Sequence, residues 1–97
     1  MSQIREIVDR YLEFHRELRS ENWTNSNGYV LRRFATEIVE IGCLSIQEIC
    51  TANLQSWFYM KARLVKVQTA AAYLFHIQHF LDWCIEKLAR ILSETGY

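Results

Sequence analysis

The sequence predicts an all-α fold, a compact bundle of four helices in a single domain covering residues 1–97. The chain of 97 residues contains no Pro and only three Gly, so few positions interrupt regular structure. Apolar residues make up 51% of the chain and recur at steps of three and four, as on the buried face of a helix. No alternating apolar and polar run is long enough to indicate a strand. A chain of this length forms one small domain with a modest core.

The first helix is expected at about residues 2–20. Ser2 is a suitable N-cap, and the apolar positions from Ile4 onward follow a helical period. Arginines and acidic residues alternate around the rest of this helix, which predicts a solvated face rather than an acid/base pair.

A second helix is expected at about residues 25–41, after a polar connection dense in turn and capping residues. Thr24, Asn25 and Ser26 are all candidate N-caps, and Gly42 is a suitable residue to follow the last turn. Trp23 is expected either to pack against the start of this helix or to be exposed for a partner.

A short linker follows, and its apolar residues Leu44, Ile46 and Ile49 are expected to pack into the core. Thr51 then caps a third helix, expected at about residues 52–63.

The fourth helix, expected at about residues 67–92, is the longest stretch with an apolar helical period. At a rise of 1.5 Å per residue it would span about 39 Å. Its outer side includes Trp83, an unusual residue to expose unless another surface covers it. The first turn, near Lys66, Gln68 and Thr69, contains no acidic residue. A helix start with free N–H donors and a neighbouring lysine suits a phosphate group.

Basic residues are concentrated in two windows, although the formal net charge is zero. The window between Glu21 and Glu37 contains two arginines and no acid, and the window between Glu48 and Asp82 contains three cations and no acid. The two windows together carry +5 and the rest of the chain −5, which predicts a positive face on a neutral protein.

This charge pattern favours a nucleic-acid partner, because arginine and lysine bind phosphates while hydroxyl and amide side chains contact phosphates or base edges. If all five cations bind phosphate, we expect a log–log salt slope of about −4 to −5. The expected DNA-binding residues are Asn25, Arg32, Arg33, Lys61, Arg63, Lys66, Gln68, Thr69 and His76.

Membrane and secretory classes have no support. No apolar run approaches the roughly 20 uninterrupted residues that a membrane span needs, and the polar start lacks the apolar region of a signal peptide. The three cysteines lack CxxC spacing and indicate reduced cytosolic thiols. We therefore expect a cytoplasmic location and no membrane partner.

Motifs for catalysis are also missing, since the chain has no Gly-rich phosphate loop and no nucleophile elbow. His76 and His79 form an HxxH pair one helical turn apart, with Asp82 as the candidate for a third ligand. Two imidazoles alone rarely hold zinc. We expect no metal site, no cofactor and no catalytic residues.

Three stretches of the chain carry a family resemblance over roughly residues 4–90. The first is YLEFHREL, followed by a polar turn and a helix that ends at Gly42. In the second, LSIQEICTANLQSWF, the matching positions are Leu44, Ile46, Ile49, Thr51 and Leu54. In the third, QTAAAYLFHIQHFLDWCIEK, they are Thr69, Leu74, Ile77, Phe80, Leu81, Trp83 and Cys84. This order of signals resembles the N-terminal core-binding (SAM-like) domain of tyrosine recombinases, the phage-integrase family.

The resemblance implies a four-helix bundle that forms half of a clamp around duplex DNA, with its second and fourth helices facing the DNA. It also implies a separate catalytic domain of the same parent chain, carrying an arginine, a lysine, an HxxR element and a tyrosine nucleophile. We expect that domain to be absent here, so that this chain binds DNA for integration and recombination without being an enzyme. Other recombinase subunits are implied partners, and the implied location is a prokaryotic cytoplasm, at the nucleoid when bound.

The chain departs from the family pattern at its end. An Asn-Pro commonly follows the fourth helix in that family, whereas this sequence reads LARILSETGY. The departure leaves open whether the chain is an excised domain or a truncated protein.

A small helical protein–protein interaction module is the alternative. In that case an exposed Trp83, Phe75 or Tyr29 would dock a partner helix. Such binding would survive high salt, at which binding driven by phosphates weakens.

Overall fold

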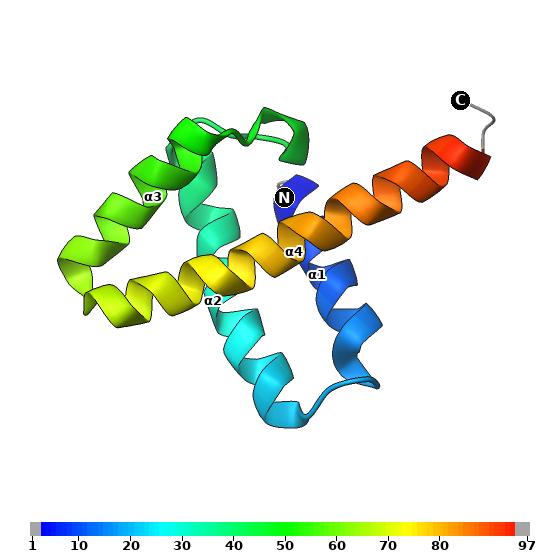
Figure 1. Ribbon diagram of the computed structural model, residues 1–97, viewed down its shortest axis with the longest axis horizontal. Coiled ribbons are helices and arrows are strands. Elements are labelled where there is room, and N and C mark those ends of the chain that lie inside the picture. The colour runs from blue at the N-terminus through cyan, green and yellow to red at the C-terminus, as the bar shows by residue number, and fades with distance from the viewer. Residues whose placement is uncertain (1–2, 95–97) are drawn as a thin grey trace.

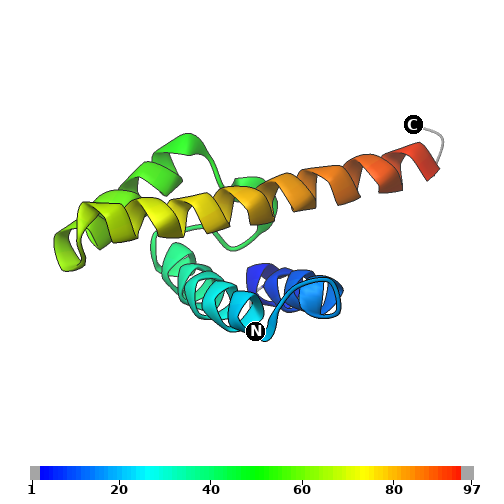
Figure 2. The ribbon, with the colours of Figure 1, turned by 60° about the horizontal axis from the view of Figure 1, so that its bottom comes forward.

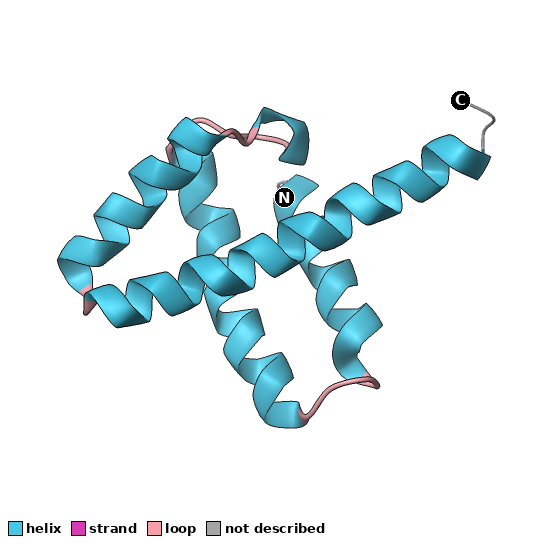
Figure 3. Cartoon of the chain, viewed as in Figure 1, coloured by secondary structure: helices cyan, strands magenta, loops and turns pink. Residues whose placement is uncertain are grey.

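Four α-helices joined by short loops make up the part of the chain that the structure describes (Figure 3). The structure, a computed structural model, describes the backbone of residues 3–94 and the side chains of residues 3–87. The elements are α1 (Gln3–Arg16), α2 (Glu21–Glu40), a 3-10 helix (Ile46–Glu48), α3 (Thr51–Leu64) and α4 (Val67–Glu94). The described residues contain no strand. The expected all-α fold with four helices is therefore confirmed.

The helices form two layers. α1 and α2 run antiparallel in one layer, and the pair α3 and α4 lies across them in the other (Figure 1, Figure 2). α4 crosses and contacts both α2 and α1, while α3 packs on α4 and α2. The core lies between the layers and consists of Ile4, Val8, Tyr11, Leu12, Val30, Leu31, Phe34, Ala35, Ile38, Cys43, Trp57, Ile77 and Phe80.

Trp57 joins α3 to this core. Its side chain is fully buried, and its ring meets that of Phe34 on α2 edge-on, with 5.4 Å between centroids. Edge-on aromatic pairs add a favourable electrostatic contribution to the apolar area that they bury. α3 is thereby held against the middle of α2.

α1 ends at Arg16, four residues before the expected boundary at residue 20. The N–H groups of Leu18 and Arg19 both donate to the carbonyl of His15 at 3.0 Å, which closes the last turn and leads the chain into the next cap. The expected N-cap Ser2 lies outside the described residues.

α2 begins at Glu21, so the expected start near Asn25 is wrong by one helical turn. Ser20 is the N-cap, and its Oγ accepts the N–H of Trp23 at 3.1 Å. The half-buried Trp23 packs on Tyr11 of α1, with 6.2 Å between ring centroids. Ser20 was not among the expected caps Thr24, Asn25 and Ser26, all of which lie inside the helix.

The linker after α2 turns at Gly42, whose φ of 115° lies in the left-handed region that favours glycine. Ile46 and Ile49 are half-buried against the core, but Leu44 is exposed, contrary to expectation. The N–H of Ile46 donates to Oε1 of Gln3 at 2.9 Å, and this bond fixes the linker to the start of α1. Leu44 lies outside that anchored turn.

α3 and α4 lie close to the expected ranges. The N-cap of α3 is Cys50 rather than Thr51, because the backbone N–H of Cys50 donates to Oδ1 of Asn53 at 2.9 Å. α4 continues to Glu94, and its C-terminal end projects past α1 (Figure 1). Residues 95–97 and the side chains from residue 88 onward lie outside the described part.

α1 covers the expected exposed Trp83. The ring centroid of Trp83 lies 5.3 Å from that of Tyr11 and 5.8 Å from that of Phe14, so its side chain is half-buried. None of the described helices is both long and apolar enough to cross a membrane.

Candidate nucleic-acid interface

One side of α2 carries a row of exposed polar and aromatic residues that face a groove. Asn25, Tyr29, Arg32, Arg33 and Thr36 recur at helical steps, are all exposed, and all line the same groove of about 1050 Å³ between α2 and α1. The side chain of Tyr29 is 61% exposed. This face brings together three of the expected DNA-binding residues.

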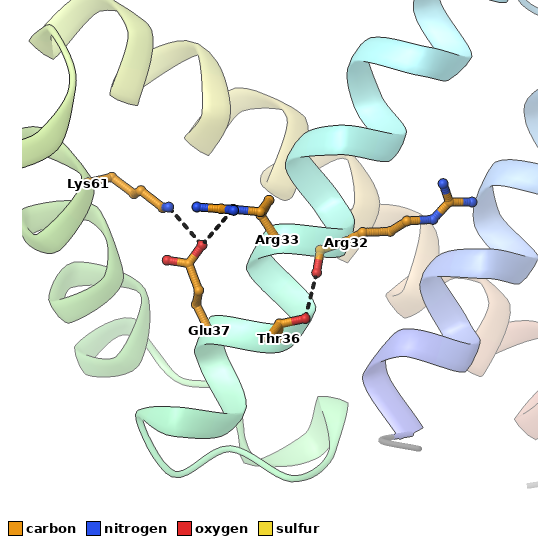
Figure 4. A network of polar contacts seen from close by, with 5 residues as sticks. All are labelled: Arg32, Arg33, Thr36, Glu37 and Lys61. Atoms are coloured by element: carbon orange, nitrogen blue, oxygen red, sulfur yellow. Dashed lines mark hydrogen bonds and ion pairs between the residues drawn. The ribbon is translucent and has the colours of Figure 1, made fainter.

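Arg32 reaches across the groove to α1. Its Nε lies 3.6 Å from Oδ1 of Asp9, and Figure 4 shows its guanidinium extending toward the α1 ribbon. Both side chains are about half exposed. Ion pairs this exposed contribute about 0–1 kcal/mol, so Asp9 can give way to another anion at low cost.

Glu37 holds two cations at the far end of the same helix. Its Oε1 lies 3.5 Å from Nε of Arg33 and 2.7 Å from Nζ of Lys61 (Figure 4). The Lys61 contact is an ion pair whose angles fall outside hydrogen-bond geometry. Glu37, which ends the acid-free window of α2, therefore offsets part of the positive charge of Arg33 and Lys61.

Lys61 is buried. Its side chain is only 8% exposed, and its ammonium lies 5.7 Å from the ring centroid of Trp57 as well as against Glu37. The expectation that Lys61 presents its charge to DNA does not fit this position, because a phosphate would have to displace Glu37 from a desolvated site. The residue ties α3 to α2 instead.

A second, smaller pocket adjoins the α2 face. It has a volume of about 110 Å³ and lies where α2 meets the end of α3 and the start of α4. Tyr29 and Arg33 line both this pocket and the larger groove. The other residues that line the pocket are Val30, Trp57, Lys61, Leu64, Val65 and Tyr73. The two residues of α2 thus connect the groove to the turn between α3 and α4.

Arg63 and Lys66 flank that turn and are exposed. Neither has an ion pair among the described residues. The first turn of α4 contains no acid, as expected, and Gln68 is exposed there. This turn carries the two unpaired cations of the expected set.

Thr69 and His76 are half-buried and lie seven residues apart on one side of α4, with Tyr73 between them. Burial lowers the pKa of His76, and the neighbouring His79 lowers it further. The lowered pKa favours the neutral imidazole of His76 near pH 7. No group of three His, Cys, Asp or Glu side chains within the described residues could hold a metal ion.

Two features of this interface differ from what the sequence predicted. α2 begins with Glu21 in its first turn, so the expected acid-free helix start near Asn25 does not exist; Asn25 lies in the second turn of the helix. Tyr29 was not among the expected DNA contacts, although it lies four residues from both Asn25 and Arg33, and that spacing places it on their face.

No protein-family model, curated protein or solved structure matches the chain.

Proposed function

We propose that this chain binds duplex DNA, mainly through phosphates, as the core-binding domain of a tyrosine recombinase or integrase. The observation that carries the proposal is the continuity of the α2 face with the basic turn between α3 and α4. Arg33 belongs to both cavities, and Arg63 and Lys66 are exposed and unpaired at the turn among the described residues. A catalytic domain of the parent chain and other recombinase subunits would act with it.

The chemistry of the interface suits phosphate. Arg32 is exposed and its partner Asp9 is half exposed, so a phosphate can replace Asp9. The side chain of Arg33 is 60% exposed, so it can bind a phosphate while its Nε stays near the largely buried Glu37. Asn25, Gln68 and Thr69 supply amide and hydroxyl donors for phosphate oxygens or base edges. A location at the nucleoid of a prokaryotic cytoplasm goes with this role.

The burial of Lys61 changes the expected salt dependence. Four exposed cations remain on this face, namely Arg32, Arg33, Arg63 and Lys66. If each of them binds one phosphate, counterions are released from the DNA and the log–log salt slope of binding would be about −3.6. The slope expected for five cations was about −4 to −5.

The test is fluorescence anisotropy with a labelled, short, mixed-sequence duplex between about 50 and 200 mM salt. The double variant Arg63→Ala/Lys66→Ala should weaken binding and make the slope less steep by about 1.8. The control Arg10→Ala/Lys87→Ala removes the same charge from another surface and should leave the slope unchanged. Equal losses in the two doubles, or no binding at the lowest salt, would overturn the proposal.

A second readout locates the surface. In an NMR titration with the same duplex, amide shifts should concentrate in α2 from Asn25 to Thr36 and around the turn from Arg63 to Thr69. Shifts confined to other elements would assign DNA binding, if present, to a different face.

A further inference from the structure

An apolar groove lies on the opposite side of α1 from the groove between α1 and α2. It has a volume of about 590 Å³ and lies between α1, the 3-10 helix and the second half of α4. Its apolar residues are Ile7, Phe14, Ile46, Trp83 and Cys84. α1 lies between this groove and the α2 groove, and Glu13 of α1 lines both.

The aromatic side chains of the groove pack on the buried core residue Tyr11. The ring of Tyr11, which is buried, meets that of Trp83 edge-on at 5.3 Å between centroids. Trp83 in turn packs on Phe14 at 5.8 Å, and the side chain of Phe14 remains 47% exposed. The groove therefore presents a preformed aromatic surface, which lowers the conformational cost of binding.

The rim of the groove is positive. Nζ of Lys87 lies 5.1 Å from the ring centroid of Phe14 and 5.6 Å from that of Trp83, so the ammonium is held above the aromatic surface. Arg10 lines the groove from α1 and, like Lys87, has no ion pair among the described residues. The acid on the rim, Glu13, is paired with Arg16 at 3.4 Å.

We propose that this groove binds an acidic amphipathic helix of a partner protein. The two cations select for acidic side chains, and the aromatic surface between them takes an apolar one from the same helix face. α1 and α4 form the two walls of the groove, and α4 continues past α1 (Figure 1). A helix is the element that fits between two helical walls, with apolar anchors spaced three and four residues apart.

The proposal does not depend on DNA binding. Lys87 follows Lys66 by 21 positions, and along α4 that separation corresponds to about 30 Å. The chain can therefore hold DNA at one end of α4 and a partner helix at the other.

The test uses two synthetic stapled peptides of equal length. Both carry leucines on one helix face, and one places Glu where the other places Lys at the flanking positions. Titrated into the 15N-labelled chain, the Glu peptide should shift the indole N–H of Trp83 and the amides of Phe14 and Lys87, and should bind at least about tenfold more tightly than the Lys peptide.

Charge reversal provides the matched variants. Arg10→Glu/Lys87→Glu should invert the preference, so that the Lys peptide binds better, while DNA binding stays unchanged. Arg63→Glu/Lys66→Glu carries the same change in charge and should lose DNA binding but keep the peptide preference. Because each variant should affect only one of the two interactions, failure of the docking proposal can be distinguished from failure of the DNA-binding proposal.

Three outcomes would overturn the docking proposal. Equal affinity for the two peptides would remove the selectivity for acid, and shifts away from Phe14 and Trp83 would place binding elsewhere. A dimer in light scattering that Phe14→Asp abolishes would make a second copy of this chain the occupant of the groove.

Discussion

Nζ of Lys61 lies 2.7 Å from Oε1 of Glu37, and this contact joins α3 to α2 beneath the surface. Glu37 also holds Arg33 at 3.5 Å on the exposed side. One carboxylate therefore has two roles: with Lys61 it connects two helices, and with Arg33 it restrains a proposed DNA contact. Variants of Lys61 and of Glu37 should separate stability from DNA binding.

Lys61→Ala should destabilise the fold and leave DNA binding of the folded protein unchanged. Removal of the ammonium leaves a largely buried carboxylate with only a weak partner, at a cost of about 1–3 kcal/mol in the free energy of unfolding. Urea denaturation measures the loss, and anisotropy in the absence of urea measures DNA binding. Lys66→Ala is the control, because this exposed lysine should change stability by less than about 0.5 kcal/mol and should weaken DNA binding. A loss of affinity in Lys61→Ala equal to that in Lys66→Ala would contradict the buried role.

Glu37→Gln should raise affinity for DNA. The substitution removes the charge that competes with phosphate for Arg33, whose side chain is 60% exposed. A gain of about 0.2–1 kcal/mol would correspond to roughly a 1.5- to 5-fold tighter complex. Glu40→Gln makes the same change in net charge on the same helix, at an exposed residue with no ion pair among those described. Anisotropy titrations at one salt concentration compare the two variants. An identical gain in DNA affinity for both would show that the gain comes from net charge and not from the release of Arg33.

Ser20→Ala should destabilise α2, because the Oγ of Ser20 accepts the N–H of Trp23 at its first turn. The typical cost of such a loss is about 1 kcal/mol in the free energy of unfolding. Ser26→Ala is the matched comparison, since Ser26 is exposed inside the helix and alanine is the better helix former there. In thermal or urea unfolding, Ser20→Ala should be clearly less stable than Ser26→Ala. The reverse order would indicate that the helix begins near residue 25.

Stability should fall as the pH drops from 7 to 5. Burial lowers the pKa of His15, and Arg19 lowers it further, so the unfolded chain binds a proton more readily than the folded chain does. The free energy of unfolding therefore decreases as the pH falls through about 6.5, the ordinary value, and levels off below the lowered one. His76 adds to the same slope, because burial and His79 lower its pKa as well.

His15→Phe isolates this effect. Phenylalanine keeps a ring beside Tyr11 and Trp23, which lie 4.6 Å and 5.2 Å from the His15 ring, and removes the titration. Urea unfolding at several pH values should give a flatter dependence for His15→Phe, and a still flatter one when His76→Gln is added. A slope identical to that of the unaltered chain would exclude these two histidines as its source.

The helices follow from the sequence because their determinants are local. The absence of Pro, the apolar period and the left-handed Gly42 are properties of neighbouring residues, and the four helices form in the expected order. The start of α2 did not follow, since the expected caps Thr24, Asn25 and Ser26 lie inside the helix and Ser20, an equally suitable cap by residue type, precedes it.

The pairing and the exposure of the charged side chains depended on the tertiary structure. Counting along the chain gave acid-free windows around Arg32 and Lys61, but folding brings Asp9 to the first and Glu37 to the second. These pairs join residues 23 and 24 positions apart, a separation that no local pattern encodes. The sequence by itself determined which segments are helical and which of their faces are apolar, because those depend on period and propensity. Only the packing of α1, α2 and α3 decided that Lys61 is buried and that Tyr29 and Arg33 face both cavities, because burial and ion pairing depend on contacts between distant segments.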